Sequence, residues 1–252
     1  MLLEMNIKSA ELGKATKVNV ILPTDVGDAP HPYKTVWLLH GLSGDESAWM
    51  RYTSIERYAK EYGLAVIMPD AERSWYTNTA YGMNFFSYIT EELPELCRKA
   101  FGCLSERRED TIVAGLSMGG YGALKVALTY PERYGTCISL SGSLDITRKG
   151  RSYRLEEWRS IFGFDIESAL ELEGSEHDLF ALAERNKNGG KPFPELYLWC
   201  GLEDSLIGAN RDFDAHLSRL GVPHVFTSSE GDHSWRFWDM HIKNALRWKF
   251  GS

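Results

Sequence analysis

Short runs of apolar residues alternate along this chain with longer stretches in which apolar residues recur every three or four positions. Side chains alternate between faces along a strand and return to one face every 3.6 residues along a helix, so the short runs predict strands and the longer ones helices. We expect strands at 18–22, 36–40, 64–68, 111–114, 136–140, 196–200 and 224–228. We expect helices at 48–62, 85–100, 120–130, 210–220 and 235–248, the second of them interrupted by Pro94.

The predicted strands are apolar at almost every position, as in Leu64-Ala-Val-Ile-Met68. Strands of this kind are typical of parallel sheets that are covered on both faces. Their alternation with helices predicts a doubly wound, mostly parallel α/β sheet. The alternation stops between 142 and 195, where helix-like pieces at 154–162 and 179–185 form an insertion. Two interpretations of this insertion stay open: a cap that shapes an active-site pocket, or a decoration of the surface.

The length of 252 residues is compatible with one large α/β domain or two small ones, and no linker rich in Gly, Pro or Ser is present, so we expect a single α/β domain over 1–252. Hydrophobic residues make up 43% of the 252 residues and charged residues 25%. The net charge is −7 and no cluster of Lys and Arg occurs, so neither nucleic acid nor an anionic membrane is an expected partner. No apolar run approaches the ~20 residues that a membrane span needs.

The cysteines and the amino-terminal residues predict a cytoplasmic protein. The first residues contain Glu4 and no long apolar segment, unlike a secretory signal. The four cysteines contain no C-x-x-C pair, which favours free thiols in a reducing compartment over disulfides or a zinc site. We therefore expect no bound metal.

A candidate nucleophile stands where one strand meets the next helix. The strand 111–114 runs into Gly115-Leu116-Ser117-Met118-Gly119, a G-x-S-x-G motif followed by a helical pattern. A serine on so sharp a turn has strained backbone angles, and neighbours without a Cβ avoid clashes there. The motif predicts that Ser117 projects above the carboxyl edge of the sheet, with the Met118 amide as one donor to an oxyanion.

A second donor is expected after the strand 36–40. That strand ends in His40-Gly41-Leu42, and the Leu42 amide would face the amide of Met118 across the substrate. We interpret His40 as a structural residue of this loop, because the role of base is better filled elsewhere.

His233 is the predicted base. It lies in a loop between the last strand and the last helix, and the order Ser, acid, His along the chain is that of the α/β-hydrolase triad. Asp204 follows the strand 196–200 and is the predicted acid, with Glu203 as the alternative. Asp232 is adjacent to His233 in sequence and is badly placed to bond its ring.

Five segments of the chain together resemble the esterase D-like "putative esterase" family, and they are most similar to its bacterial tributyrin-esterase branch. They read HGLSGDESAW, MPDAERSWYTNTAYG, GLSMGGYGAL, GLEDSLI and GDHSWRFWD, and the likeness spans about 5–250. The resemblance implies an α/β-hydrolase fold, no cofactor, a small-molecule ester substrate and a homo-oligomer such as a dimer or tetramer. By the same resemblance, the catalytic triad would consist of Ser117, Asp204 and His233, and the backbone amides of Leu42 and Met118 would be the oxyanion donors.

These observations predict a serine carboxylesterase acting on short acyl esters of the acetyl or butyryl type. Feruloyl esterases and S-formylglutathione hydrolases are relatives, so their substrates are the alternatives. The latter usually carry a cysteine in the oxyanion loop, whereas 41–45 reads Gly-Leu-Ser-Gly-Asp. A non-catalytic binding protein on the same fold is a remote third hypothesis. Among the aromatic residues beside the motifs, Trp235, Tyr121 and Trp75 are the predicted substrate contacts, and packing at the rim of the core is the alternative for each.

Overall fold

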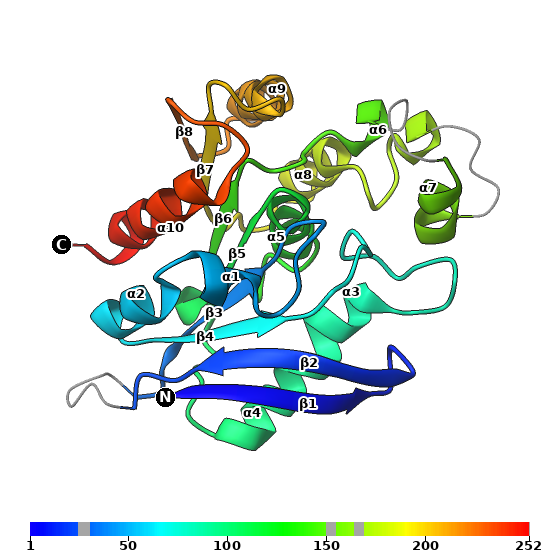
Figure 1. Cartoon of the computed structure of the whole chain (residues 1–252). Coiled ribbons are helices and arrows are strands. Elements are labelled where there is room, and N and C mark those ends of the chain that lie inside the picture. Colours follow the sequence, from blue (N-terminus) through cyan, green and yellow to red (C-terminus); the bar gives the residue numbers. More distant parts are fainter. Residues whose placement is uncertain (25–30, 150–154, 164–168, 252) are drawn as a thin grey trace.

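The molecule is built around an eight-stranded, mostly parallel sheet (Figure 1). The computed structural model describes residues 1–24, 31–149, 155–163 and 169–251. The strands lie in the order β1-β2-β4-β3-β5-β6-β7-β8, with β1 and β2 antiparallel to their neighbours and the remainder parallel. Their bounds are β1 Leu2–Ser9, β2 Lys14–Ile21, β3 Lys34–Leu39, β4 Leu64–Pro69, β5 Thr111–Leu116, β6 Thr136–Leu140, β7 Glu195–Gly201 and β8 Val225–Ser229. The predicted α/β fold class is confirmed.

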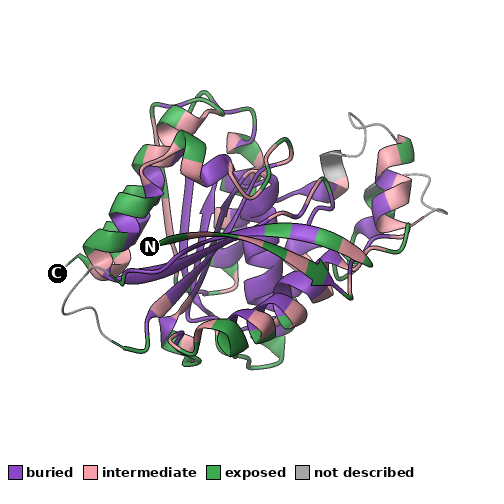
Figure 2. Cartoon of the chain, turned by 60° about the horizontal axis from the view of Figure 1, so that its bottom comes forward, coloured by how far each residue is buried: buried purple, intermediate pink, exposed green. Residues whose placement is uncertain are grey.

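Helices cover both faces of the sheet and leave its strands buried (Figure 2). One face packs against α1 Ala48–Tyr52, α2 Ile55–Tyr62 and α10 Trp235–Phe250. The other face packs against α4 Leu93–Phe101, α5 Met118–Thr129, α8 Leu179–Asn188 and α9 Ile207–Arg219. Burial on both faces is why strands such as β4 are apolar along their whole length.

Two predicted helices are interrupted. The helix expected at 48–62 divides at Thr53 and Ser54 into α1 and α2. The helix expected at 85–100 consists of α3 Phe85–Ser87, a π-helical turn η1 Tyr88–Glu92 and α4. Pro94 has no N–H to donate and occupies the first turn of α4, and the N–H of Leu93 bonds back to Tyr88 O, five residues earlier.

The insertion 142–195 contains α6 Ile146–Lys149, α7 Leu155–Phe162, the 3-10 helix η3 Ala169–Leu172 and α8. Position 154, where the first helix-like piece was expected to start, lies outside the described residues. The described part of the insertion packs on the nucleophile helix, since the Tyr121 hydroxyl donates to His177 O at 2.9 Å. Another 3-10 turn, η2 Arg108–Asp110, precedes β5. None of the helices among the described residues is long and apolar enough to span a membrane.

Candidate active site

Ser117 occupies the turn between β5 and α5, at the carboxyl edge of the sheet. Its backbone has φ 53° and ψ −117°, outside the usual regions for a residue with a Cβ. The turn is possible because its neighbours are glycines: a Cβ on Gly115 would lie 2.2 Å from Gly119 O, and one on Gly119 would lie 2.4 Å from Leu39 O. The G-x-S-x-G segment therefore forms the sharp turn that its sequence predicts.

Three side chains from three loops form one hydrogen-bonded chain beside this turn. His233 Nε2 lies 3.0 Å from Ser117 Oγ, and His233 Nδ1 lies 2.8 Å from Asp204 Oδ2. Asp204 follows β7, and His233 lies between β8 and α10. A carboxylate can only accept a hydrogen bond, so Nδ1 carries the proton and Nε2 is free to accept the proton of the Ser117 hydroxyl.

Asp204 is buried and ionised. Burial alone raises the pKa of its carboxyl group, but hydrogen bonds from His233 and from the Leu206 N–H outweigh that effect and hold the pKa below its usual value. Ser141 also lowers the pKa of Asp204, and its own Oγ accepts the indole N–H of Trp238 at 3.1 Å. The sequence analysis missed Ser141, although it directly follows β6 at the same sheet edge.

The predicted oxyanion donors are Met118, which follows Ser117 as the first residue of α5, and Leu42, which lies in the loop after β3 and lines the same cavity as Ser117. Within the described residues, neither N–H has a hydrogen-bond acceptor. The loop is held from behind by His40, whose Nδ1 lies 2.7 Å from Gly41 O and whose Nε2 accepts the Ala71 N–H at 2.9 Å. His40 thus has the structural position that the sequence predicts.

A cavity of about 520 Å³ opens beside Ser117 and His233. Trp235, predicted as a substrate contact, lines it and stacks on Tyr52 with ring centroids 5.0 Å apart. Tyr52 and Trp238 also line it and were missed by the sequence analysis. None of the residues that form this lining is a lysine, an arginine, an aspartate or a glutamate.

Trp75 and Tyr121, the other two predicted substrate contacts, do not line this cavity. Their side chains are 1% and 0% exposed, and their rings pack edge to face with centroids 5.7 Å apart. Trp75 also packs against Trp158 of the insertion. Both residues are therefore packed in the core, which was the alternative to a substrate contact, and neither contacts this cavity.

The acids that competed with Asp204 have other contacts. Glu203 Oε2 accepts the N–H of Gly231 at 2.6 Å and so fixes the loop that leads to His233. Asp232 accepts the hydroxyl of Ser234. No cluster of three or more His, Cys, Asp or Glu side chains suited to a metal ion occurs in the part of the chain that the structure describes.

A nucleophile turn at the carboxyl edge of a mostly parallel sheet, with a histidine and an acid following later strands, defines the class of α/β-hydrolase-fold serine hydrolases. Comparison with known proteins identifies the group within that class. The sequence model of the family described as "Putative esterase" matches residues 9–248, and the chain belongs to this family.

Individual relatives agree with this assignment. An acetyl esterase of Caldicellulosiruptor saccharolyticus is 33% identical to the chain, over 98% of the chain and 97% of the relative. FphF, a fluorophosphonate-binding serine hydrolase of Staphylococcus aureus, superposes with a TM-score of 0.91 at 37% identity, over 100% of the chain and 99% of FphF. S-formylglutathione hydrolase (FrmB) of Staphylococcus aureus superposes with a TM-score of 0.87 at 37% identity and the same coverage. The chain is therefore an esterase of the serine hydrolase class.

Proposed function

We propose that this protein is a carboxylesterase that hydrolyses short-chain acyl esters, of the acetyl or butyryl type, through Ser117, His233 and Asp204. The observation that carries the proposal is the continuous hydrogen-bonded chain from the Ser117 hydroxyl through the His233 ring to the buried Asp204 carboxylate. Such a chain activates a serine by giving its proton a base to move to.

In the first half of the reaction, Ser117 Oγ attacks the ester carbonyl carbon while His233 Nε2 takes the hydroxyl proton. The carbonyl oxygen becomes an oxyanion, which accepts hydrogen bonds from the backbone N–H groups of Leu42 and Met118. Asp204 stabilises the imidazolium that has formed. When the bond to the alkoxy oxygen breaks, His233 gives its proton to the departing alcohol and the acyl group stays on Ser117.

In the second half, a water molecule replaces the alcohol beside His233. His233 takes a proton from the water as its oxygen attacks the acyl carbon, and the same two amides hold the second oxyanion. The ester bond to Ser117 Oγ then breaks, and His233 returns its proton to that oxygen. The acid leaves and the serine is restored.

The cavity supports a neutral substrate with a short apolar chain. Its lining combines the ring faces of Tyr52, Trp235 and Trp238 with the small residues Gly44 and Ala48. An apolar acyl chain gains about 0.8 kcal/mol for each CH₂ group that it buries on such a surface. The 33% sequence identity to an acetyl esterase, over 98% of this chain and 97% of the relative, also supports a substrate with a small acyl group.

S-formylglutathione hydrolysis is the second candidate, because FrmB of Staphylococcus aureus is 37% identical with a TM-score of 0.87. Glutathione carries two carboxylates and an ammonium group. The residues that line the cavity beside Ser117 offer no fixed charge to pair with them. We therefore place the short-chain ester first.

A substrate panel separates the two candidates. The chain and its Ser117→Ala variant are assayed with p-nitrophenyl acetate, butyrate and octanoate, methyl ferulate and S-formylglutathione. We expect the largest kcat/KM for acetate or butyrate, and loss of turnover in the variant. Dominant turnover of S-formylglutathione or methyl ferulate would replace the proposed substrate, and full activity of Ser117→Ala would overturn the mechanism.

A further inference from the structure

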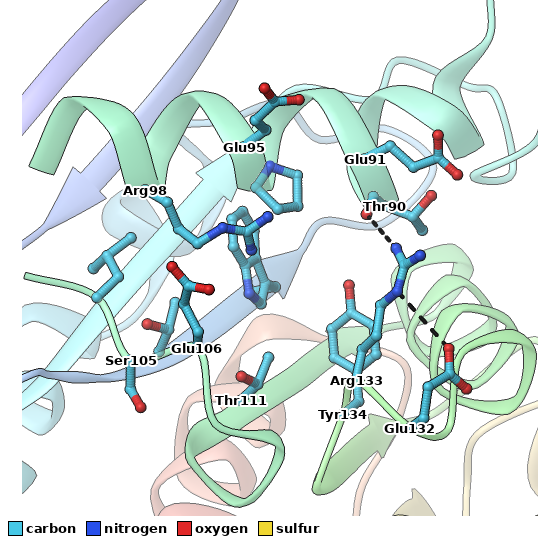
Figure 3. A pocket seen from close by; sticks show the side chains of 14 residues that line it. Thr90, Glu91, Glu95, Arg98, Ser105, Glu106, Thr111, Glu132, Arg133 and Tyr134 are labelled. Atoms are coloured by element: carbon cyan, nitrogen blue, oxygen red, sulfur yellow. Dashed lines mark hydrogen bonds and ion pairs between the residues drawn. The ribbon is translucent and has the colours of Figure 1, made fainter. Parts of the chain in front are cut away.

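Two cavities of similar size lie at opposite ends of the parallel strands, and they differ in charge. The cavity of about 550 Å³ at the amino ends of β3 and β5 is lined by four glutamates and two arginines (Figure 3). The cavity of about 520 Å³ beside Ser117 is lined by no lysine, arginine, aspartate or glutamate. Asp204 is 2% exposed and does not line this cavity, so the groups that hold the acid in place are buried behind it.

Trp238 of α10 joins the wall of this cavity to the buried side of the triad. Its side chain lines the cavity and is 5% exposed. Its ring packs edge to face with the ring of His233, with centroids 4.8 Å apart and an angle of 88° between the planes. Its indole N–H donates to Ser141 Oγ at 3.1 Å. One side chain therefore contacts the substrate cavity, the base and a buried serine.

The Ser141 hydroxyl has one proton of its own to donate. The bond from Trp238 occupies one of the two lone pairs of Oγ, and the proton is directed to another acceptor. Two groups are within its reach, the Asp204 carboxylate and the Cys200 thiol: burial raises the pKa of each, and a hydrogen bond from Ser141 lowers it. Burial raises the pKa of Cys200 to about 12, so the thiol stays protonated and is a weak acceptor. The carboxylate is the stronger acceptor of the two.

The backbone of Ser141 has a conformation that suits a glycine better than a serine. Its φ is 46°, in the left-handed region, and its N–H donates to Trp199 O at 2.6 Å, which holds the chain in that conformation. A residue with a Cβ pays free energy for a positive φ, and such strain is found where the side chain has a function. Here the side chain brings a hydroxyl to the catalytic acid.

We propose that Ser141 and Trp238 are a positioning pair for the triad. The indole N–H of Trp238 fixes the Ser141 hydroxyl, the hydroxyl donates to the Asp204 carboxylate, and the Trp238 ring holds the ring of His233. The carboxylate then accepts three hydrogen bonds, since Oδ1 accepts the Leu206 N–H at 2.9 Å and Oδ2 lies 2.8 Å from His233 Nδ1. This inference rests on the proposed function, because it concerns the same triad.

Two substitutions of Ser141 test the role of its hydroxyl. Ser141→Ala and Ser141→Gly both remove the hydroxyl, and we expect kcat for p-nitrophenyl butyrate to fall about tenfold in each, with little change in KM. The rate at which a fluorophosphonate modifies Ser117 should fall by a similar factor. Glycine adopts a positive φ without strain, so Ser141→Gly should melt at a higher temperature than Ser141→Ala. A purely structural role would instead make kcat follow the melting temperature.

Trp238→Phe tests the other half of the pair. It keeps an aromatic ring beside His233 and removes the N–H that fixes the Ser141 hydroxyl. We expect a smaller fall in kcat than in Ser141→Ala, and a double variant that is no slower than Ser141→Ala, because both changes act through the same hydroxyl. Losses that multiply in the double variant would overturn the pairing.

Ser139→Ala is the matched control. Ser139 is a fully buried serine of β6, two residues before Ser141, and its Oγ has no hydrogen-bond partner among the described residues. Its loss should leave kcat unchanged. The inference alone is overturned if the wild type is active and Ser141→Ala matches its kcat, or if Ser139→Ala is slowed as much as Ser141→Ala. A wild-type chain that hydrolyses no ester of the panel and does not react with the fluorophosphonate would overturn the proposed function, and this inference with it.

Discussion

The bond between His40 and Gly41 O offers a sharp test of how the oxyanion loop is held. Gly41 O and the Leu42 N–H belong to one planar peptide unit, so fixing the direction of the carbonyl fixes that of the amide. The His40 ring is 1% exposed and contacts Gly41 O at 2.7 Å and Ala71 N at 2.9 Å. A carbonyl only accepts and an amide N–H only donates, so the ring is neutral, with its proton on Nδ1.

Two substitutions of His40 separate the two bonds. In His40→Asn the side-chain amide can still donate to Gly41 O, and in His40→Gln the longer side chain can still accept the Ala71 N–H. Gly41 O also accepts the Gly44 N–H at 3.0 Å, so His40→Gln removes one of its two hydrogen bonds. Complete loss of an oxyanion donor costs about 10²–10³ in rate. If half of that stabilisation is lost with one of the two hydrogen bonds to Gly41 O, kcat should fall about 10- to 30-fold, or about 1.4–2 kcal/mol.

The assay is steady-state kinetics with p-nitrophenyl butyrate beside urea unfolding of each variant. KM should change little, because the oxyanion charge develops only in the transition state. His40→Asn leaves the buried Ala71 N–H unpaired and should lose about 1–3 kcal/mol of unfolding free energy, whereas His40→Gln leaves Gly41 O with the Gly44 N–H and should lose less. The reasoning is refuted if His40→Asn and His40→Gln lose the same factor in kcat, or if the loss appears in KM alone.

Three further predictions concern the turn, the insertion and the cavity. Gly119→Ala would place a Cβ 2.4 Å from Leu39 O, so we expect a misfolded chain or one without esterase activity, measured by circular dichroism and turnover. Burial, aided by the charge of Lys125, lowers the pKa of His177 from 6.5 to about 2. The unfolded chain therefore binds one more proton between these pH values, and stability should fall below pH 6.5 by up to about 1.4 kcal/mol per unit, a slope that His177→Gln should reduce in urea melts. Trp235→Ala should lower kcat/KM for p-nitrophenyl butyrate about tenfold more than for the acetate, because two CH₂ groups lose their apolar contact; equal losses would contradict this assignment of the wall.

The parts of the site that follow from local sequence or from topology could be predicted. The nucleophile turn is a local feature, because Gly115 and Gly119 are required wherever a serine takes this backbone geometry. The convergence of Asp204 and His233 with Ser117 follows from topology, since the carboxyl ends of parallel strands meet at one edge of the sheet. The structure brings the three side chains together, and their catalytic roles stay predictions for the experiments above.

The directions of single aromatic side chains could not be predicted in this way. Trp75 has φ 52°, a left-handed conformation that its sequence does not reveal, and its ring turns inward to pack against Trp158 of the insertion. Ser141 also has a left-handed backbone, with φ 46°, and its hydroxyl lies where it lowers the pKa of Asp204, which its sequence does not reveal either. By contrast, the strand β1 could have been predicted from the sequence but was missed. Its residues alternate between an exposed and a partly buried face, which is the pattern of an edge strand, and it pairs with β2.

Mass spectrometry of the intact chain after incubation with a fluorophosphonate tests the central claim most directly. If the ring of His233 activates Ser117 as its hydrogen bonds indicate, the wild type gains one adduct, peptide mapping places it on Ser117, and His233→Ala reacts far more slowly. A folded wild-type chain that stays unmodified, or an adduct located on a different residue, would contradict the account.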